Sequence, residues 1–398
     1  MARLKIAAVV TEYSTNAHAQ HIIDRFLWGY KWKGRHHHPA MDLVGIYVDQ
    51  FGDGDLSRDR ARRFPTMKIY STIEEALTLG GEKLAVDGVV LIGEHGRYPR
   101  NEKGQMLYPR YEFFTEIVDV FRRSGRSVPV FSDKHLSWNW AWAKDMVDTS
   151  KEMGFPFIAG SSLPLQRRMP PVEIPRDAEV EEVVGVAPGG VDGYDIHCLE
   201  SIQCMVERRK GGETGVVSLH ALRGEAVFEA MALGSWDAGG WDSELFEACL
   251  CRSHSLTPPR EGFNHILPQA EEIPALLNEQ PVVYRYEYVD GTKATMILLE
   301  GLIHDFTFAA RLRGSPEPLS LHLLVDGRNP RNFFNPQVNA MEQMFLTGKP
   351  TFPIERTLLT TGLTAAGVES LWQGQKRIAT PNLAIQYQPT EGSTFWRE

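Results

Sequence analysis

The sequence predicts an α/β domain with a doubly wound parallel sheet, followed by an α+β domain whose sheet is open and largely antiparallel. Short apolar runs alternate with helical patterns over roughly the first 160 residues, as in sheets wound on both faces. The proline-rich stretch SSLPLQRRMPPVEIPRD at 161–177 then interrupts this alternation. Longer strands with alternating polarity follow it, which indicates a second architecture. Since 398 residues exceed what one core usually supports, we place one domain at 1–160 and another at 161–398.

The first domain contains five apolar runs of the type found in buried strands. They lie at 5–10, 42–48, 88–92, 128–131 and 156–159. Four helical patterns separate these runs: 17–30, a segment from the capping box Ser71-x-x-Glu74 to Gly80, about 111–124 and about 137–153. Strands alternating with helices predict a parallel sheet covered on both faces.

The second domain shows hairpin-linked strands with helices set apart from them. Its strands are predicted at 179–186, 214–222, 281–289, 293–300, 303–311 and 318–325. Two of them flank Asp290-Gly291, a strong hairpin signal. Helices at about 336–347 and 355–373 end the chain. An open sheet of this size often packs against a copy of itself, so we expect a homo-oligomer.

The overall charge and hydropathy exclude some classes of function. A formal net charge of -9 argues against nucleic acid or an anionic membrane as the main partner. No apolar run approaches the roughly 20 residues that a membrane helix needs. The first apolar stretch lacks a small-residue cleavage site and runs directly into Glu12, which favours a buried strand in a cytoplasmic protein over a signal peptide.

Titratable side chains follow the predicted parallel strands at the points where these strands end. In doubly wound sheets, ligands bind beyond the carboxyl ends of the strands. Each residue alone has an ordinary explanation; Asp133, for example, could cap the helix that begins near 137. Their gathering on one edge nevertheless predicts a site. The residues are Glu12, His18, Asp49, Glu94, His95, Asp133, Lys134 and His135.

Three segments resemble the glucose–fructose oxidoreductase / inositol dehydrogenase family (Gfo/Idh/MocA). Asp133-Lys134-His135 in VPVFSDKHLSWNW stands where that family has Glu-Lys-Pro at a strand end. GGVDGYDIHCLESIQCMVERR is similar to the family's glycine-rich lead into a histidine motif, with His197 on the family histidine and Glu200 on its last acid. The closing stretch from NPQVNAMEQMF onward resembles the family's final helices.

The resemblance implies a Rossmann-like first domain and an NAD(P)-dependent dehydrogenase of sugars or cyclitols, with its active site between the domains. Lys134 and His197 would then be the acid–base pair, with Asp133 as a further catalytic residue. A buried lysine can lose its proton through desolvation or polarise a carbonyl, and histidine titrates near neutral pH. The bland interpretation of His197 is a polar residue at the start of its own helix.

The turn after the first strand departs from the dinucleotide fingerprint. TEYSTNAH contains no glycine, although the fingerprint uses glycines to let the backbone approach the pyrophosphate. A cap at Ser14–Asn16 would still present helix amides to an anion, and Asp49 stands where an adenosine ribose is held. The residues predicted to contact NAD or NADP are Thr11, Ser14, Asn16, Asp49 and Glu94.

A carbohydrate-like small molecule is the predicted substrate. The long polar loop 93–113 offers hydroxyl-recognising and aromatic side chains, although a plain surface excursion would look the same. The predicted substrate contacts are His95, Tyr98 and Asn101 on this loop, with Tyr194 and Asp195 beside His197.

Two other classes of function remain open. His18, His95, His135 and His197, with Glu94 or Asp133, have the chemistry of a divalent metal site. Such a site could support a non-redox lyase, epimerase or hydrolase, but the spacing is not a metal motif and no ligand set is assigned. A non-catalytic binding protein is the third class, against which the retained Lys134 and His197 argue.

Overall fold

The computed structural model describes residues 3–325, 327–328 and 331–397. The chain divides into two compact units, one formed by 1–162 with 326–358 and the other by 163–325 with 359–397. The break after residue 162 lies two residues from the predicted boundary at 160. The segment 326–358, which we assigned to the second domain from the sequence, folds into the first unit, and that assignment is corrected here.

In the described part of the first unit, six parallel strands form one sheet in the order β5-β4-β1-β6-β7-β8. The strands are β1 (Leu4–Glu12), β4 (Met41–Gln50), β5 (Lys68–Tyr70), β6 (Gly88–Ile92), β7 (Val130–Asp133) and β8 (Phe157–Gly160). The strand order reverses between β1 and β6, the position at which such sheets bind ligands. The predicted parallel sheet is confirmed, although β5 was not predicted.

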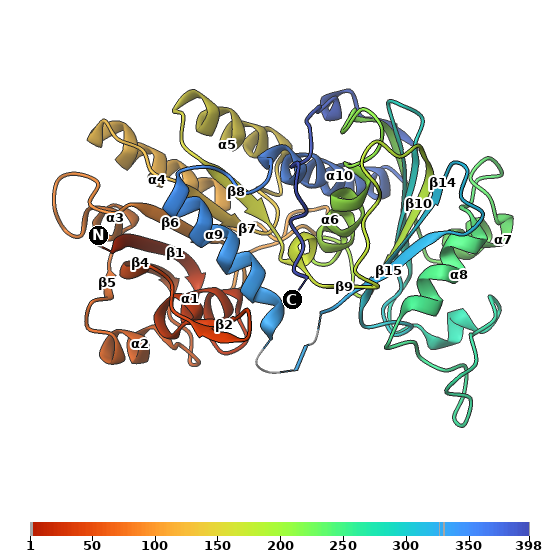
Figure 1. Cartoon of the computed structure of the whole chain (residues 1–398), viewed down its shortest axis with the longest axis horizontal. Helices are drawn as coiled ribbons and strands as arrows, with labels where there is room; N and C mark the ends of the chain where they lie inside the picture. The colour runs from red at the N-terminus through yellow and green to blue at the C-terminus, as the bar shows by residue number, and fades with distance from the viewer. Residues whose placement is uncertain (1–2, 326, 329–330, 398) are drawn as a thin grey trace. The chain divides into compact units, whose positions relative to one another are not determined.

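Helices cover both faces of this sheet, as the alternation predicted. Helix α1 (His18–Trp28) packs beside α9 on one face, and α3 (Ile73–Thr78) and α5 (Trp140–Glu152) flank α4 (Arg110–Ser124) on the other (Figure 1). The side chain of Thr72, rather than Ser71, caps α3 by accepting a hydrogen bond from the Glu75 amide. The elements α2 (Ser57–Arg63), β2 (Tyr30–Trp32) and β3 (Arg35–His37) were not predicted, and β3 takes in part of the HHH run.

Specific contacts tie α9 (Asn335–Thr347), preceded by the 3₁₀ turn Asn332–Phe334, to the first unit. The Glu342 carboxylate accepts hydrogen bonds from Tyr30 Oη at 3.0 Å, His37 Nε2 at 2.7 Å and the Ala40 amide at 2.9 Å. The Phe345 ring lies against Gly88, where a Cβ atom would come within 2.7 Å of it. These contacts explain why α9 belongs to the first unit. The sequence pattern of a helix does not show which of the two sheets that helix will cover.

In the second unit, eight strands within the described residues form a sheet in the order β16-β11-β12-β13-β10-β14-β15-β9. Only β10 and β13 pair in parallel, and the predicted Asp290-Gly291 hairpin joins β12 to β13. The largely antiparallel sheet is therefore confirmed. The strands are β9 (Arg168–Met169), β10 (Val180–Ala187), β11 (Val216–Arg223), β12 (Val282–Tyr288), β13 (Lys293–Leu298), β14 (Phe306–Leu312), β15 (Leu319–Leu323) and β16 (Ile378–Ala379).

Helices lie on both faces of the second sheet. Helix α6 (Asp195–Val206) and the later part of α10 (Ile354–Trp372) pack on one face. Helices α7 (Glu225–Leu233) and α8 (Ser243–Arg252), which the sequence did not predict, cover the other with a core that includes Trp241, Val283 and Ile297 (Figure 1). Short 3₁₀ turns at Leu163–Leu165, Ile273–Leu276 and Pro381–Leu383 complete the unit.

Replacing Gly367 by alanine should destabilise the second unit by about 1–3 kcal/mol. In an open helix this change would gain about 1 kcal/mol of helix propensity. Here the new Cβ atom would lie 2.2 Å from the ring of Tyr284, which is fully buried and hydrogen-bonded to Asp195. Denaturant unfolding measures the change, with Gly52→Ala, at an open position, as the control. A stabilised Gly367→Ala variant would contradict this packing.

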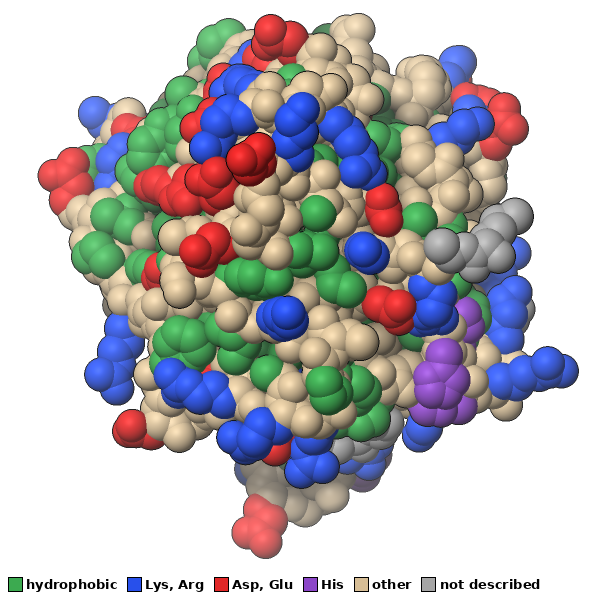
Figure 2. All heavy atoms as spheres, turned by 90° about the vertical axis from the view of Figure 1, so that its left-hand side faces the viewer, with side chains coloured by type: hydrophobic (Ala, Val, Ile, Leu, Met, Phe, Trp, Pro, Cys, Tyr) green, Lys and Arg blue, Asp and Glu red, His purple; other side chains and the backbone are tan. Residues whose placement is uncertain are grey.

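The surface of the first unit mixes charges of both signs. Figure 2 shows Lys and Arg side chains interspersed with Asp and Glu on one face, with hydrophobic side chains in small groups between them. Exposed ion pairs such as Arg123–Glu74 and Arg63–Asp59 belong to this unit. Among the described residues, no helix is both long and apolar enough to span a membrane.

Candidate functional site

The carboxyl edge of the first sheet holds a buried group of ion pairs centred on Glu94. This residue follows β6, and its carboxylate receives Lys134 Nζ at 2.9 Å and Arg110 Nη2 at 2.5 Å. Lys134 follows β7, and Arg110 is the first residue of α4. Arg110 is fully buried, and Glu94 and Lys134 are each less than a tenth exposed. Three elements therefore converge on one fixed charge arrangement.

The ion pairs set the charge state of Lys134 and Glu94. Burial disfavours the charged form of Lys134, but the Glu94 carboxylate outweighs it and the pKa of Lys134 is raised. Burial likewise opposes ionisation of Glu94, but Lys134 and Arg110 together hold its pKa well below the usual range. Of the two expectations for Lys134, loss of its proton through desolvation is contradicted by the raised pKa, which favours the charged ammonium.

Left-handed backbone conformations occur at the turns that carry this group. Lys134 has φ 60° and His95 has φ 71°, in a region that side-chain-bearing residues adopt only at a cost. Such strain persists where the surroundings fix it, and here the Glu94 ion pair holds Lys134 from its far end. Strained, immobilised side chains at a sheet edge are typical of binding and catalytic sites.

A histidine–carboxylate pair lies beside the lysine. His18, the first residue of α1, places Nδ1 2.6 Å from Oδ2 of the buried Asp133. A carboxylate only accepts, so Nδ1 carries the hydrogen when the ring is neutral, and the lone pair is on Nε2. The His18 ring also meets the rings of His95 at 5.2 Å and Phe334 at 5.3 Å. This pair can orient a proton acceptor at the strand-order reversal.

The other histidines at this edge are held neutral. Burial and the adjacent Arg110 hold the pKa of His135 well below its usual value, and burial followed by the charge of His18 lowers that of His95. Because Arg110 Nη1 can only donate across its 3.2 Å contact with His135 Nε2, the lone pair of His135 is already used. In the part of the chain that the structure describes, no group of three or more His, Cys, Asp or Glu side chains is placed to hold a metal ion.

Several buried polar atoms at this edge have no hydrogen-bond partner among the described residues. They are Ser132 Oγ, Asp133 Oδ1, His95 Nε2 and His135 Nδ1. Buried polar atoms are ordinarily paired, and leaving one unpaired costs roughly 1–3 kcal/mol. A bound molecule or ordered water would satisfy them, so the edge has the chemistry of a ligand site.

His21, one turn after His18 on α1, predicts a measurable pH dependence. Burial, with Arg331 nearby, lowers the pKa of His21 to about 3, so the folded protein keeps it neutral where the unfolded chain, with its pKa near 6.5, takes up a proton. This stability is complete above pH 6.5 and declines as the pH falls. When the pH falls from 7.5 to 5.5, protonation of His21 in the unfolded chain should lower the free energy of unfolding by about 1.4 kcal/mol.

Denaturant titrations at the two pH values check this. His21→Phe keeps the stacking on Phe334, whose ring lies 4.9 Å away. Between the two pH values its free energy of unfolding should fall by about 1.4 kcal/mol less than that of the wild type. His36→Phe, in the exposed hairpin, is the control. Equal pH dependence in wild type and His21→Phe would contradict the prediction.

The turn after β1 takes a left-handed bend without glycine. Asn16 has φ 68°, a conformation that asparagine tolerates better than most residues. The residue before α1 is Ala17, which has no side-chain acceptor, so the predicted cap at Ser14–Asn16 is not formed by a side chain. Instead, Ser14 Oγ donates to the Glu12 carboxylate, and the backbone N–H of Asn16 donates to Gln20 Oε1 at 2.7 Å. The first amides of α1 are therefore not covered by a capping side chain.

Two of the predicted cofactor contacts are used within the fold. The Thr11 hydroxyl is fully buried and donates to the Glu94 carbonyl at 2.7 Å. The carboxylate of Glu94 itself is taken up by Lys134 and Arg110. Asp49, at the end of β4, is exposed, and its two oxygens accept the hydroxyls of Tyr47 at 2.8 Å and Tyr98 at 2.6 Å. Tyr98, predicted to contact substrate, thus lies at the predicted ribose position.

Asn101 has a local role in its loop. Its Oδ1 accepts the amides of Lys103 and Gln105, each at 3.0 Å, and its Nδ2 donates to the Gln105 side chain at 3.1 Å. These bonds close the turn 101–105. The side-chain amide of Asn101, which we expected to recognise substrate, therefore shapes the loop.

The remaining predicted residues belong to the second unit, at the start of α6. His197 lies on the first turn, with its ring 5.8 Å from that of Tyr194 and 6.1 Å from that of Phe306. Tyr194 is 46% exposed and stacks parallel to Phe306. Asp195 is fully buried and accepts the Ile196 amide and the Tyr284 hydroxyl, which gives it a part in the structure of its own loop.

Sequence reasoning missed Arg110 and the pairing of His18 with Asp133. Arg110 directly precedes the predicted helix at 111–124, and arginine is common at such positions without being buried. His18 and Asp133 are 115 residues apart. The only available signal was that both follow strands of one predicted edge.

Comparison with solved structures identifies the fold. Among similar structures are a myo-inositol dehydrogenase from Lactobacillus casei in complex with NAD(H) and myo-inositol (12% identity, 98% of this chain and 99% of that chain covered, TM-score 0.57) and GenD2 from gentamicin A biosynthesis in complex with NAD (12%, 95% and 97%, 0.57). A Gfo/Idh/MocA family oxidoreductase from Vibrio cholerae is similar as well (13%, 93% and 99%, 0.52). No model of a known protein family and no curated protein matches the sequence. The resemblance to Gfo/Idh/MocA oxidoreductases is thereby confirmed for the fold.

Proposed function

We propose that this protein is an NAD(P)-dependent oxidoreductase acting on a sugar, cyclitol or related polyol or keto-sugar. The observation that carries the proposal is the Lys134 ammonium, buried at the carboxyl edge of the sheet and fixed by Glu94 at 2.9 Å. A fixed cation at this edge can stabilise negative charge on a substrate oxygen. Structures of this fold with NAD, and with NAD(H) and myo-inositol, support the class of cofactor and substrate.

The residues after β1 and β4 fit a dinucleotide in a cradle without fingerprint glycines. The first amides of α1, which no side chain caps, would receive the pyrophosphate. Asn16 supplies the left-handed bend that a fingerprint glycine commonly provides. Asp49, positioned by two tyrosine hydroxyls, would accept a ribose hydroxyl. When bound, the nicotinamide supplies the hydride acceptor.

Lys134 and His197 divide the proton chemistry in this proposal. Lys134 keeps its proton because of Glu94 and donates a hydrogen bond to the substrate oxygen, lowering the cost of an alkoxide there. His197 takes the hydroxyl proton, the role that the resemblance of its segment implies. Asp133 orients His18, whose Nε2 is a second proton acceptor beside the lysine.

The His18–Asp133 hydrogen bond also favours a second candidate function. A histidine oriented by a buried carboxylate is a general base, and with a fixed lysine it could abstract a proton next to a carbonyl. That chemistry belongs to a lyase or epimerase without net redox. It needs no dinucleotide turnover, which separates it from the first candidate.

A product assay distinguishes the two candidates. The protein is incubated with inositols, hexoses and keto-sugars, with and without NAD⁺ or NADP⁺, and followed by absorbance at 340 nm and by proton NMR. The dehydrogenase predicts reduced nicotinamide in step with substrate oxidation, and loss of both on His197→Asn. Substrate conversion without dinucleotide, lost on His18→Asn, would replace it with the second candidate.

We also propose association into a homo-oligomer, since the second sheet has eight strands and is larger than the six-stranded sheet that the sequence predicted. Light scattering behind gel filtration measures it. A mass of 44.9 kDa, that of one chain, at micromolar concentration would count against it.

A further inference from the structure

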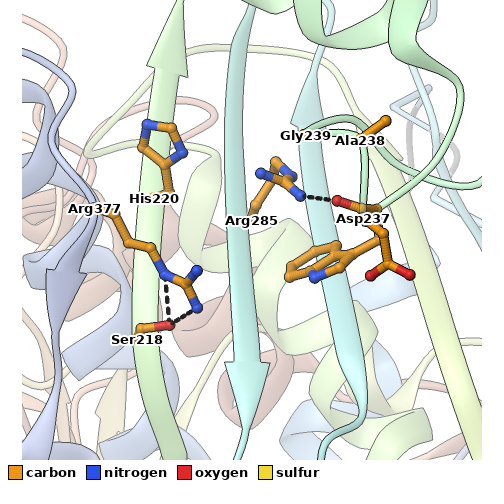
Figure 3. Close-up of a pocket in the computed structure, with 8 residues that line it drawn as sticks. Ser218, His220, Asp237, Ala238, Gly239, Arg285 and Arg377 are labelled. Carbon is orange, nitrogen blue, oxygen red and sulfur yellow. Dashed lines mark hydrogen bonds between the residues drawn. The ribbon is translucent and has the colours of Figure 1, made fainter.

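A pocket in the second unit lies outside every residue set that the proposed function uses. It has a volume of about 340 Å³, within the range of small-molecule sites. Ser218 and His220 project into it from β11 and Arg285 from β12, while the α7–α8 loop closes one side (Figure 3). Arg377, just before β16, reaches in beside Ser218 (Figure 3).

Arg285 places a positive charge in this pocket that no carboxylate neutralises directly. Its Nε donates to the Gly240 carbonyl and its Nη2 to the Trp236 carbonyl, each at 2.8 Å. Its guanidinium lies 4.3 Å from the centre of the Trp236 ring. Among the described residues, none forms an ion pair with Arg285. These contacts hold a partly buried cation in place with Nη1 still available.

The guanidinium of Arg377 makes the charged form of Arg285 less favourable. Burial lowers the pKa of Arg285, the Glu182 carboxylate opposes this effect, and the charge of Arg377 adds a smaller lowering. Arg377 donates to Ser218 Oγ at 2.7 Å and to the Glu287 carboxylate at 3.0 Å. Two like charges that repel one another across a pocket would be stabilised by an anion between them.

The acidic lining residue does not supply that anion. Asp237 is 88% exposed at its side chain and pairs with Lys293 at 2.8 Å, so its charge is already matched at the pocket's outer side. His220 Nε2 donates to the Gln375 carbonyl at 2.9 Å, and burial lowers the pKa of this ring. The ring therefore stays neutral, and its Nδ1 carries a lone pair that can accept a hydrogen bond. The pocket therefore combines Arg285, for which no ion pair is found among the described residues, with neutral donors and acceptors.

We propose that this pocket binds a small anion, a phosphate or carboxylate group, between Arg285 and Arg377. Planar guanidinium groups bind both groups through paired hydrogen bonds. Ser218 adds a hydroxyl at the Arg377 side, and His220 adds an acceptor for a ligand hydroxyl. The anion is either free in solution or the charged group of a small polyhydroxylated metabolite.

Isothermal titration of the full chain with inorganic phosphate and with glycerol 3-phosphate tests the proposal. We expect saturable binding of at least one probe, weakened at least about tenfold by Arg285→Gln and by Arg377→Gln, since each removes a charge-assisted hydrogen bond to the anion. Arg313→Gln, at an exposed arginine paired with Glu179 and Glu181, is the matched control and should bind as the wild type does.

The two probes separate the two sources of the anion. Tighter binding of glycerol 3-phosphate indicates a metabolite, and equal binding indicates the free anion; both support the site. Arg377 is largely exposed, so Arg377→Gln should fold even if Arg285→Gln does not. Absence of saturable binding with both probes, or equal loss in Arg313→Gln and Arg377→Gln, would overturn the proposal. Neither result depends on dinucleotide binding.

Discussion

Replacing Lys134 by alanine is expected to lower kcat/KM about a thousandfold, equivalent to about 4 kcal/mol of transition-state stabilisation. The reason is that the ammonium is buried, kept protonated and fixed by Glu94, so it meets a developing alkoxide without reorganising. Loss of one preorganised donor of this kind typically costs a factor of about 10²–10³. Steady-state kinetics with the substrate found in the product assay measure the effect.

Two variants make the Lys134 experiment specific. Lys134→Gly removes the same ammonium and also relieves the left-handed strain at φ 60°, so it should fold at least as well as the alanine variant and be equally inactive. Lys144→Ala removes an exposed lysine that pairs with Asp148 on α5, and should retain full activity. Activity of Lys134→Ala within tenfold of the wild type would show that the lysine is structural.

Replacing Arg110 by methionine is expected to destabilise the first unit by about 3–5 kcal/mol. Arg110 is fully buried, and its side chain packs on Gly93 while it binds Glu94 and His135. Its loss leaves the Glu94 carboxylate with one cation instead of two. Chemical denaturation measures the change, and Arg122→Met, exposed on the same helix, should stay within about 0.5 kcal/mol of the wild type.

The effect of Arg110→Met should depend on pH in a defined direction. Burial raises the pKa of Glu94, but Lys134 and Arg110 lower it by more, so its folded pKa is below that of the unfolded chain, near 4.5. The stability that Glu94 supplies is complete above pH 4.5 and is lost as the pH falls through the folded pKa. The difference between wild type and variant should therefore shrink below pH 4.5. If the difference in the free energy of unfolding does not change with pH, the effect of Arg110→Met comes from lost packing alone.

Much of the fold could be predicted because local pattern and tertiary environment agree. The residues 6–10 are apolar at every position, and the structure buries all of them between two helical layers. Asp290-Gly291 predicted a hairpin that the structure forms. Strand β5, of three residues, and helices α7 and α8 escaped prediction. Short elements contain too few repeats of the hydrophobic pattern to be recognised in the sequence. Which helices pack on a face of a sheet is decided by tertiary contacts.

The candidate site could be predicted as an edge but not as a set of bonds. Parallel strands bring Glu94 and Lys134 together, and the edge rule found both. It could not show that Glu94 would raise the pKa of Lys134, because that depends on a 2.9 Å contact between residues 40 positions apart. The left-handed turns at His95 and Lys134 were not predicted either, since histidine adopts this conformation only occasionally and nothing in lysine favours it.

The most direct test of the proposed dehydrogenase is isothermal titration of the full chain with NAD⁺, NADH, NADP⁺ and NADPH. We expect at least one of them to bind with a Kd in the micromolar range, about -8 kcal/mol, in a cradle formed by Asn16, the first amides of α1 and Asp49. No binding of any of the four at millimolar concentration would contradict it, and the His18–Asp133 pair would then become the centre of a non-redox site.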